Sequence, residues 1–323
     1  MSKIFLGIDI GKTNFDAALL MSDKKIKIKK FSNNKSGFKL LEDWLKTCNV
    51  NIENIHACME VTGIYSESLA DFLYGINCMV SVVNPAKIKG FGMSELSRTK
   101  TDRADSKLIA RFCKAMDPPA WQPTKLEYKE LQQLVRRLED LKNLIQIENN
   151  HLESVRSDEV KKSIDNVIEN LNKQIEKIIK LINDKINQNP ELQKKQELLE
   201  TIPGIGEATI IQILSFINIE NFNNVKQLDA FLGLNPQQRQ SGTSVNGKSR
   251  ISKIGSSSLR KTFYFPAIVA KQHNPIIKAF CDRLNMAGKP KMVIICAAMR
   301  KLVHIVYGVL KSGKAFDASL AIA

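Results

Sequence analysis

The 323-residue sequence predicts an α/β domain with a mixed sheet, a long coiled-coil helical insertion and a mainly α-helical C-terminal domain. Three observations support this fold class. Short strand patterns alternate with helical patterns over residues 1–120. Leucine and isoleucine recur in heptads over 121–195. Apolar helical stretches with glycine and proline turns fill 196–315, and 316–323 forms a tail.

The first segment contains five strand patterns and three helical patterns. The expected strands are residues 3–10, 14–21, 25–31, 55–61 and 78–83, and the expected helices are 37–48, 66–73 and 101–116. The order β-β-β-α-β-α-β-α is typical of a mixed sheet with helices around it. Pro118, Pro119 and Pro123 mark the end of this domain.

Two heptad runs follow the prolines. The first runs from Leu131 to Ile145, the second runs from Ile164 to Ile182, and Ser157 between them is placed to cap a helix. They predict two long helices, which form either an antiparallel hairpin or an arm that joins copies of the chain. We favour a homo-oligomer, a dimer or a tetramer, held by this coiled coil.

The net charge of +15 is concentrated in the last third of the chain. From Ala230 onwards there are 15 Lys and Arg residues but only two acids, Asp282 and Asp317, whereas residues 1–229 are nearly balanced. This asymmetry favours a polyanionic partner, and nucleic acid above a membrane, because the basic residues are interleaved with Gly, Ser and Asn.

Other features exclude a membrane or secreted protein. The longest nearly uncharged apolar run, Met292 to Met299, is shorter than the ~20 residues of a membrane span. The N-terminus lacks the pattern of a signal peptide. The six cysteines form no C-x-x-C pair and the four histidines have no zinc-like spacing, so we expect reduced thiols in a cytoplasmic protein.

Four carboxylates are candidates for a metal centre. Asp9 lies in the first strand and Glu60 at the end of the fourth. Asp102 and Asp105 share one face of the helix expected over 101–116, after the fifth strand. Oxygen ligands of this kind suit Mg²⁺, and a pair of such ions can promote phosphodiester exchange. Asp102 and Asp105 could also simply favour a helix N-terminus.

The segments around these acids resemble the DEDD domain of IS110-family transposases, which is similar to RuvC-type Holliday-junction resolvases and has the ribonuclease H-like fold. The matching segments are Gly7-Ile-Asp-Ile-Gly-Lys-Thr-Asn14, Asp16-Ala-Ala-Leu-Leu20, Glu60-Val-Thr-Gly63, Asn84-Pro-Ala-Lys87 and Lys100-Thr-Asp-Arg-Ala-Asp105. The resemblance implies that Asp9, Glu60, Asp102 and Asp105 bind Mg²⁺. Ser106 departs from the alanine more common in the family.

The first of these segments also looks like the phosphate loop of sugar kinases and actin-like ATPases. Those proteins need a second phosphate loop and a Gly-Gly adenosine segment, and the sequence contains neither. The basic final third also has no counterpart in them.

The residues from Pro236 to Ser258 predict a flexible basic loop that binds nucleic acid. Cations follow one another from Phe231 to Lys261 without an acid: Arg239, Lys248, Arg250, Lys253, Arg260 and Lys261. Ser241 is followed by Gly242, and an unhindered hydroxyl among cations could act as a nucleophile. A Ser-Gly pair alone is more often a turn.

The same segment resembles the C-terminal transposase domain of the IS110 family. The matching residues are Leu234, Pro236, Ser241, Gly242, Gly247, Ile251, Lys253, Gly255, Leu259 and Arg260. The resemblance implies that Ser241 is the nucleophile and forms a covalent phosphoserine link with DNA. Thr243 and Ser244 do not fit the family position.

Further phosphate contacts are expected outside this loop. Ile202-Pro-Gly-Ile-Gly206 resembles a helix-hairpin-helix turn, in which the amides of Gly204 and Gly206 would face phosphate. A tight interhelical turn explains the pattern equally well. Lys100 and Arg103 lie beside the acids of the helix expected over 101–116 and are also expected to contact nucleic acid.

Together these features predict a DNA transposase or recombinase of an insertion sequence, with Mg²⁺ as cofactor. The resemblance implies donor and target DNA, a structured non-coding guide RNA as partner, and a prokaryotic, nucleoid-associated location. A site-specific DNA invertase and a RuvC-like junction resolvase share this pattern. A non-catalytic nucleic-acid-binding protein is a further alternative.

Overall fold

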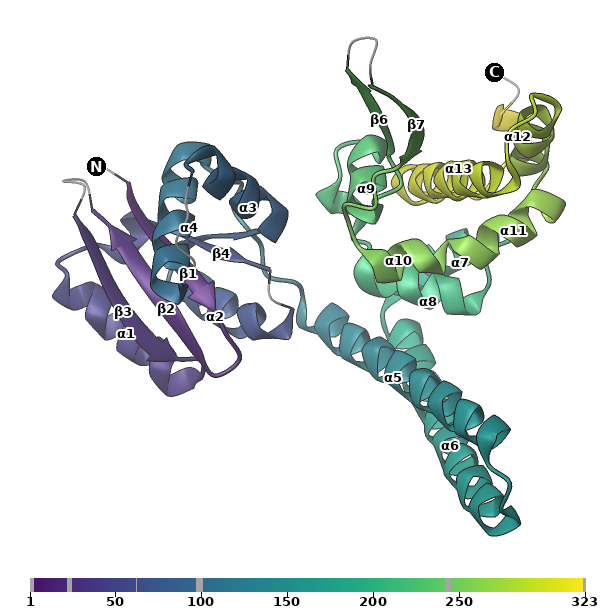
Figure 1. The fold of residues 1–323 in the computed structure, drawn as a ribbon, viewed down its shortest axis with the longest axis horizontal. Coiled ribbons are helices and arrows are strands. Elements are labelled where there is room, and N and C mark those ends of the chain that lie inside the picture. The colour runs from purple at the N-terminus through teal and green to yellow at the C-terminus, as the bar shows by residue number, and fades with distance from the viewer. Residues whose placement is uncertain (1–2, 22–24, 62, 97–100, 242–244, 322–323) are drawn as a thin grey trace. The chain divides into compact units, whose positions relative to one another are not determined.

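The computed structural model describes residues 3–21, 25–61, 63–96, 101–241 and 245–321. The chain divides into two compact units, Met1–Thr124 and Lys125–Ala323 (Figure 1). The first is the α/β unit, and the second contains the long helices and the basic third of the chain.

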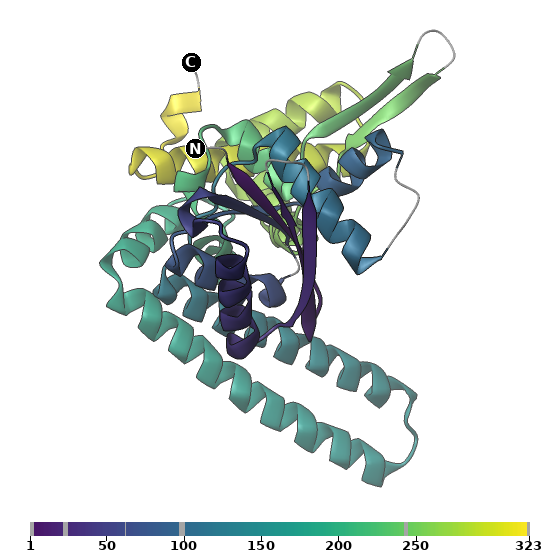
Figure 2. The ribbon, with the colours of Figure 1, turned by 90° about the vertical axis from the view of Figure 1, so that its left-hand side faces the viewer.

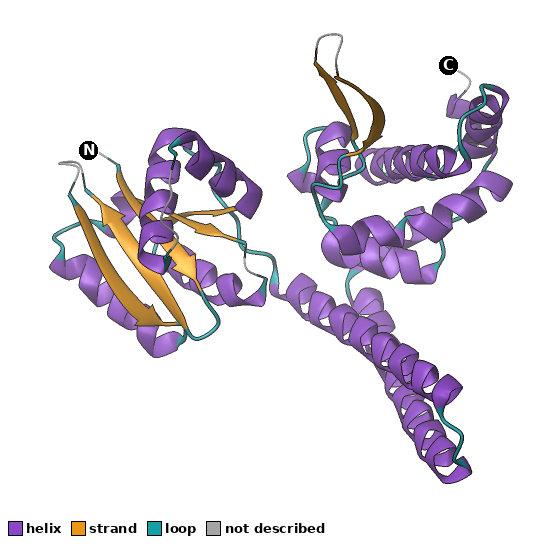
Figure 3. Cartoon of the chain, in the orientation of Figure 1, coloured by secondary structure: helices purple, strands orange, loops and turns teal. Residues whose placement is uncertain are grey.

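The α/β unit is built on a five-stranded mixed sheet, as the sequence predicts (Figure 3). Its strands, in the spatial order β3-β2-β1-β4-β5, are β3 (Ile26–Ser32), β2 (Asn14–Leu20), β1 (Ile4–Ile10), β4 (Ile55–Glu60) and β5 (Met79–Val83). β2 is antiparallel to β1 and β3, and β4 is parallel to β1 and β5. The carboxyl ends of β1, β3, β4 and β5 therefore share one edge of the sheet.

Helices cover both faces of this sheet. Leu6, Ile8 and Ile10 of β1 are buried with residues of α1 (Lys35–Thr47) and α2 (Ile64–Gly75). α4 (Asp102–Met116) packs on the other face with α3 (Pro85–Ser94) beside it. We did not predict α3, although Asn84 caps its N-terminus and Pro85 occupies its first turn.

The second unit begins with two long helices, α5 (Leu126–Ser154) and α6 (Asp158–Gln188). They pack against each other as a hairpin that turns at residues 155–157 (Figure 2). The Ser157 hydroxyl accepts a hydrogen bond from the Val160 amide at 3.5 Å, which confirms the predicted N-cap. Leu131 and Ile182 join the core of the second unit, so this core holds the base of the hairpin.

The rest of the second unit is mainly helical, as predicted. Its helices are α7 (Pro190–Glu200), α8 (Glu207–Phe216), α9 (Val225–Leu232), α10 (Ser257–Thr262), α11 (Tyr264–His273), α12 (Pro275–Met286) and α13 (Lys291–Ser312). Short 3-10 turns occupy Ile52–Asn54, Ile219–Asn221 and Ala318–Ala321.

The expectation of a loop over 236–258 is wrong. Residues Pro236–Ser241 (β6) and Val245–Ile251 (β7) pair as antiparallel strands, with an irregularity in register between Gln237 and Arg239. Both strands are made almost wholly of polar residues. They therefore lack the apolar alternation by which a strand is recognised.

Among the described helices, α13 is the one whose length and composition would allow it to cross a membrane. We considered only its apolar run from Met292 to Met299, and so missed this longer stretch. Ile294, Leu302, Val303 and Val306 of α13 are buried in the core of the second unit. This burial explains the apolar residues on the side of α13 that packs into the core, and 39% of the apolar window is buried in all.

Candidate active site

Gly7 allows α4 to lie directly on β1. A Cβ atom at Gly7 would lie 2.2 Å from the Ala110 amide nitrogen and 2.2 Å from the Ser106 carbonyl oxygen. Side chains two residues apart share a face of a strand, so Asp9 points to the face that α4 covers. The fit between Gly7 and α4 thus brings the first turn of α4 towards Asp9.

The first turn of α4 carries two of the predicted acids. Thr101 caps the helix by accepting a hydrogen bond from the Ala104 amide at 3.2 Å, and Asp102 and Asp105 follow it. The Ser106 hydroxyl donates to the Arg103 carbonyl at 3.1 Å and is buried. The serine that departs from the family pattern is therefore satisfied within its own helix.

Electrostatics show that Asp9 and the α4 acids lie close together. Burial, followed by the negative charges of Asp105, Asp102 and Asp16, raises the pKa of Asp9 from 3.8 to about 6. Like charges disfavour the ionised form of a carboxyl group, and a bound cation would remove this repulsion.

Glu60 lies at the end of β4, beside the end of β1. Ile8 pairs with Met59 in the parallel ladder, so Asp9 and Glu60 follow one position further along their strands. This register gives the two carboxylates the same edge and the same face of the sheet. The register therefore places Asp9 and Glu60 at the carboxyl edge of β1 and β4, and the contact of α4 with Gly7 brings the helix turn of Asp102 and Asp105 towards Asp9.

Two residues of this region escaped the sequence analysis as site residues. Asp16 pairs with Asp9 in the β1–β2 ladder, and Lys30 pairs with Asp16 in the β2–β3 ladder. The Lys30 ammonium nitrogen lies 3.5 Å from Oδ2 of the buried Asp16 and 3.6 Å from Oδ2 of Asp102. Only the cross-strand register reveals this arrangement.

The donor set fits a hard divalent cation. All its candidate ligands are carboxylate oxygens, which Mg²⁺ and similar ions prefer. The ammonium group of Lys30 supplies a positive charge beside them. In the described part of the chain, however, no three His, Cys, Asp or Glu side chains already form a complete metal-binding group.

Ser241 is the last residue of β6, where it pairs with Val245 of β7. Its side chain lies outside the described part of the structure, as do Gly242, Thr243 and Ser244. The predicted nucleophile therefore sits at the end of a polar two-stranded hairpin in the second unit.

The predicted phosphate-binding cations differ in their surroundings. Arg103, Arg250, Lys253 and Lys261 are exposed. Arg260 is half-buried and donates from Nη1 to the Leu232 carbonyl at 3.0 Å, which ties α10 to the end of α9. Lys100 and the side chains of Arg239 and Lys248 lie outside the described residues.

The two glycines of the predicted helix-hairpin-helix turn also differ. Gly204 has a φ of +101°, and a Cβ there would lie 2.6 Å from the Ala270 Cβ, so its role includes close packing on α11. Gly206 precedes α8 with open space around it. Gly206 is therefore the more accessible of the two backbone positions.

Comparisons with known proteins match two parts of the chain to transposase families and most of the chain to curated relatives. Residues 6–156 match a family model described as a transposase, of the IS110 DEDD type, and residues 196–282 match the transposase IS116/IS110/IS902 family. The chain is 35% identical over 319 residues to the pilin gene-inverting proteins of Moraxella bovis and Moraxella lacunata, covering 98% of each chain. It is also 22% identical over 136 residues to an uncharacterized 43.6 kDa protein of insertion element IS110 from Streptomyces coelicolor, covering 42% of this chain and 33% of that protein.

Proposed function

Because the chain belongs to the IS110 family of transposases, and is therefore a DNA transposase or recombinase, we propose that its acidic edge and its serine hairpin serve one strand-exchange reaction. In this proposal residues 1–120 form the acidic catalytic domain, 121–195 the helical arm, and 196–315 the serine domain. The gathering of Asp9, Asp102 and Asp105 at one sheet edge is the observation that carries it.

The DEDD transposase match suggests a divalent metal, and we infer Mg²⁺ from the all-oxygen donor set. Asp9, Glu60, Asp102 and Asp105 would hold the ion. When bound, it would neutralise charge on the scissile phosphate. Lys30 would keep Asp102 oriented and balance the charge of Asp16.

Ser241 would be the nucleophile of the cleavage step. Its hydroxyl oxygen attacks the scissile phosphorus and loses its proton, and the phosphorus–oxygen bond to the departing strand breaks as that strand's oxygen gains a proton. The product is a phosphoserine link to DNA. A hydroxyl of another strand then attacks the same phosphorus and releases the serine.

The cations around the hairpin would hold the DNA during these steps. Arg250, Lys253 and Lys261 are exposed and can neutralise phosphates. We also propose a structured guide RNA as a partner and association of copies through α5 and α6. The family resemblance supports the first, and the heptad pattern supports the second.

The test is a plasmid recombination assay with wild-type protein, Asp102→Asn and Ser241→Ala, each with and without RNA transcribed from the DNA flanking the gene. Both variants should abolish exchange and the covalent protein–DNA adduct seen on a denaturing gel, because the adduct forms in the cleavage step that needs both the acids and the serine. Ser258→Ala in α10 is a matched control and should retain both activities. Full exchange by Ser241→Ala would refute the assignment of the nucleophile.

DNA inversion is a second candidate, favoured by the full-length match to the pilin gene-inverting proteins. It uses the same residues and differs only in how the two recombining sites are arranged. A plasmid with the sites in inverted orientation would report inversion, and one with the sites in direct orientation would report excision. Predominant inversion would favour an invertase.

A further inference from the structure

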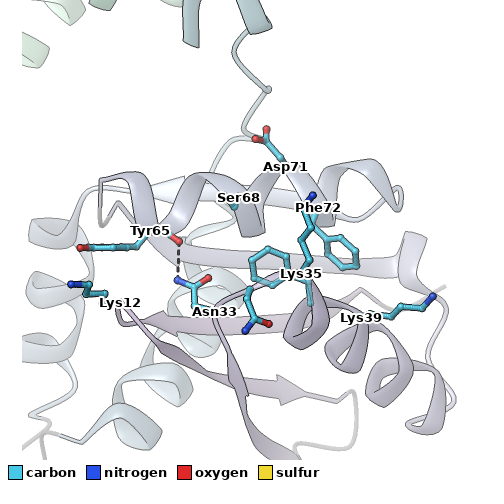
Figure 4. A pocket seen from close by; sticks show the side chains of 10 residues that line it. Lys12, Asn33, Lys35, Lys39, Tyr65, Ser68, Asp71 and Phe72 are labelled. Carbon is cyan, nitrogen blue, oxygen red and sulfur yellow. Dashed lines mark hydrogen bonds between the residues drawn. The ribbon is translucent and has the colours of Figure 1, made fainter. Parts of the chain in front are cut away.

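The α/β unit contains a pocket of about 830 Å³ between the first turns of α1 and α2. Figure 4 shows Lys12 and Tyr65 at one end of it and Lys39 at the other. This volume lies within the range of small-ligand sites and is large enough for a nucleotide.

The rim of the pocket is positively charged. Lys12, Lys35 and Lys39 line it and are exposed, and Asp71 is the single carboxylate among its described lining residues. None of the three ammonium groups forms an ion pair with a described carboxylate. Their positive charge is therefore available to an anionic ligand.

Aromatic side chains supply the apolar part of the pocket. Phe38 and Phe72 pack with their ring centroids 5.6 Å apart, and Tyr65 is 38% exposed at the rim. Lysines beside aromatic rings are the combination by which proteins bind single-stranded nucleic acid, with phosphates on the cations and bases on the rings.

Hydrogen bonds and close packing hold the pocket in shape. The Asn33 side-chain amide donates to the Tyr65 carbonyl at 3.1 Å (Figure 4). It also donates to the Gly11 carbonyl at 3.0 Å, next to Lys12, so it ties three segments of the chain together. A Cβ at Gly37 would lie 1.9 Å from the Ser32 carbonyl oxygen, so α1 sits tightly on the end of β3. The site is therefore largely preformed.

The pocket opens at the same edge of the sheet as the acidic residues. Lys12 follows Asp9 by three residues, and Tyr65 follows Glu60 by five. α1 and α2 begin where β3 and β4 end, and these strands run parallel to β1. The acidic residues lie on the face that α4 covers and the pocket lies on the face that α1 and α2 cover, so a strand bound at the acidic residues would reach the pocket by crossing this edge, where α/β proteins commonly bind their ligands.

We propose that this pocket holds an unpaired nucleotide of the DNA strand that is cut at the acidic edge, with its phosphates on the three lysines and its base against Tyr65 and Phe72. This inference rests on the proposed function. It assigns a DNA-binding role to the nearly neutral part of the chain. It also separates a strand-holding site from the catalytic acids.

The test measures binding of fluorescent oligodeoxythymidine to the full chain in EDTA, where no cleavage can occur, over a range of KCl concentrations. The pocket variant is Lys12→Gln/Lys35→Gln/Lys39→Gln. The control is Lys27→Gln/Lys89→Gln/Lys114→Gln, which removes the same charge from exposed sites of the same unit outside the pocket.

The pocket variant should lower the slope of log K against log salt by about 2, because each lost phosphate contact on a single strand contributes about 0.7. The control should change the slope much less. Tyr65→Ala should weaken binding by about fivefold or more, and Tyr65→Phe should retain it. With iododeoxyuridine in the strand, photo-cross-links should map to the first turn of α2.

Equal losses of oligonucleotide affinity and of salt dependence in the pocket variant and the control would overturn the proposal, because the net charge of the unit would then explain both. Oligouridine of the same length is tested in parallel, and a loss of binding confined to it would overturn the proposal as well, since the occupant would be RNA. If the pocket variant binds oligodeoxythymidine like wild type while recombination still requires Ser241, the pocket is wrong and the proposed function stands. If binding depends on the pocket but Ser241→Ala still recombines DNA, the pocket assignment stands and the proposed nucleophile is wrong.

Discussion

Asp9→Asn is expected to stabilise the metal-free protein while abolishing strand exchange. Burial and the charges of Asp105, Asp102 and Asp16 raise the pKa of Asp9 from 3.8 to about 6. A shift of this size corresponds to about 3 kcal/mol, which solvent screening of a half-exposed side chain reduces to about 1–2 kcal/mol at pH 7. Asparagine retains an oxygen that can accept the Ile10 amide hydrogen bond without the charge.

The raised pKa of Asp9 also determines how the stability difference between wild type and Asp9→Asn changes with pH. Asp9 loses its proton near pH 6 in the folded protein, but near 3.8 in the unfolded chain. Between these values the folded state binds more protons, so the wild-type contribution to stability falls as pH rises through this window. The advantage of Asp9→Asn should therefore be absent below about pH 4 and fully developed by about pH 7.

Thermal melting in EDTA, followed by circular dichroism at several pH values, would measure the effect. A gain of about 1–2 kcal/mol corresponds to a rise in Tm of about 3–8 °C for a unit of this size. Asp43→Asn, an exposed acid on α1, is the control and should change Tm little. Addition of Mg²⁺ should stabilise the wild type more than Asp9→Asn. A lower Tm for Asp9→Asn, or a difference independent of pH, would refute the electrostatic argument.

Three further changes test other parts of the structure. Gly7→Ala should lower the free energy of unfolding, measured in urea, by about 3 kcal/mol or more, because the new Cβ meets the backbone of α4 at 2.2 Å. Gly75→Ala, whose Cβ meets no atom, is the control and should not lower it. Lys30→Met should lower Tm in EDTA by leaving the buried Asp16 without a cation, and Mg²⁺ should restore part of the lost Tm. An unchanged Tm would exclude a role for Lys30 at the acidic edge. Asp229→Ala should lower the free energy of unfolding by about 3 kcal/mol, because this buried carboxylate accepts hydrogen bonds from Arg300 at 2.7 Å and His304 at 2.8 Å. Asp282→Ala on the surface is the control and should change it little in the same urea assay.

The α/β unit could be predicted well because its strands and helices bury apolar residues at regular spacings. Leu6, Ile8 and Ile10 alternate towards one face of β1, and Leu41 and Leu45 of α1 recur at helical spacing. The helix α3 was missed because only Ile88 and Gly92 of its residues are buried, which is too few to create a period.

The site could be predicted only in part. Asp9, Glu60, Asp102 and Asp105 stand out in the sequence because of their family resemblance and their places at the ends of strands and helices. Asp16 and Lys30 join them through cross-strand pairing, which depends on register and leaves no local pattern. The polar hairpin of β6 and β7 was missed for the reason that makes it a candidate to bind phosphate: its strands expose polar side chains instead of burying apolar ones.

Charge counted along the sequence also conceals how charge is arranged in space. Residues 1–229 are nearly neutral in sum, and the basic last third alone suggested contact with nucleic acid. At the carboxyl edge of the sheet, however, acids gather on the side of α4, and Lys12, Lys35 and Lys39 gather between α1 and α2. A strand-exchange enzyme needs both the acids and the lysines, because carboxylates that hold a metal repel the phosphates that must approach that metal. Lysines at the same edge would offset this repulsion, an arrangement that the sum of charges over residues 1–229 does not reveal.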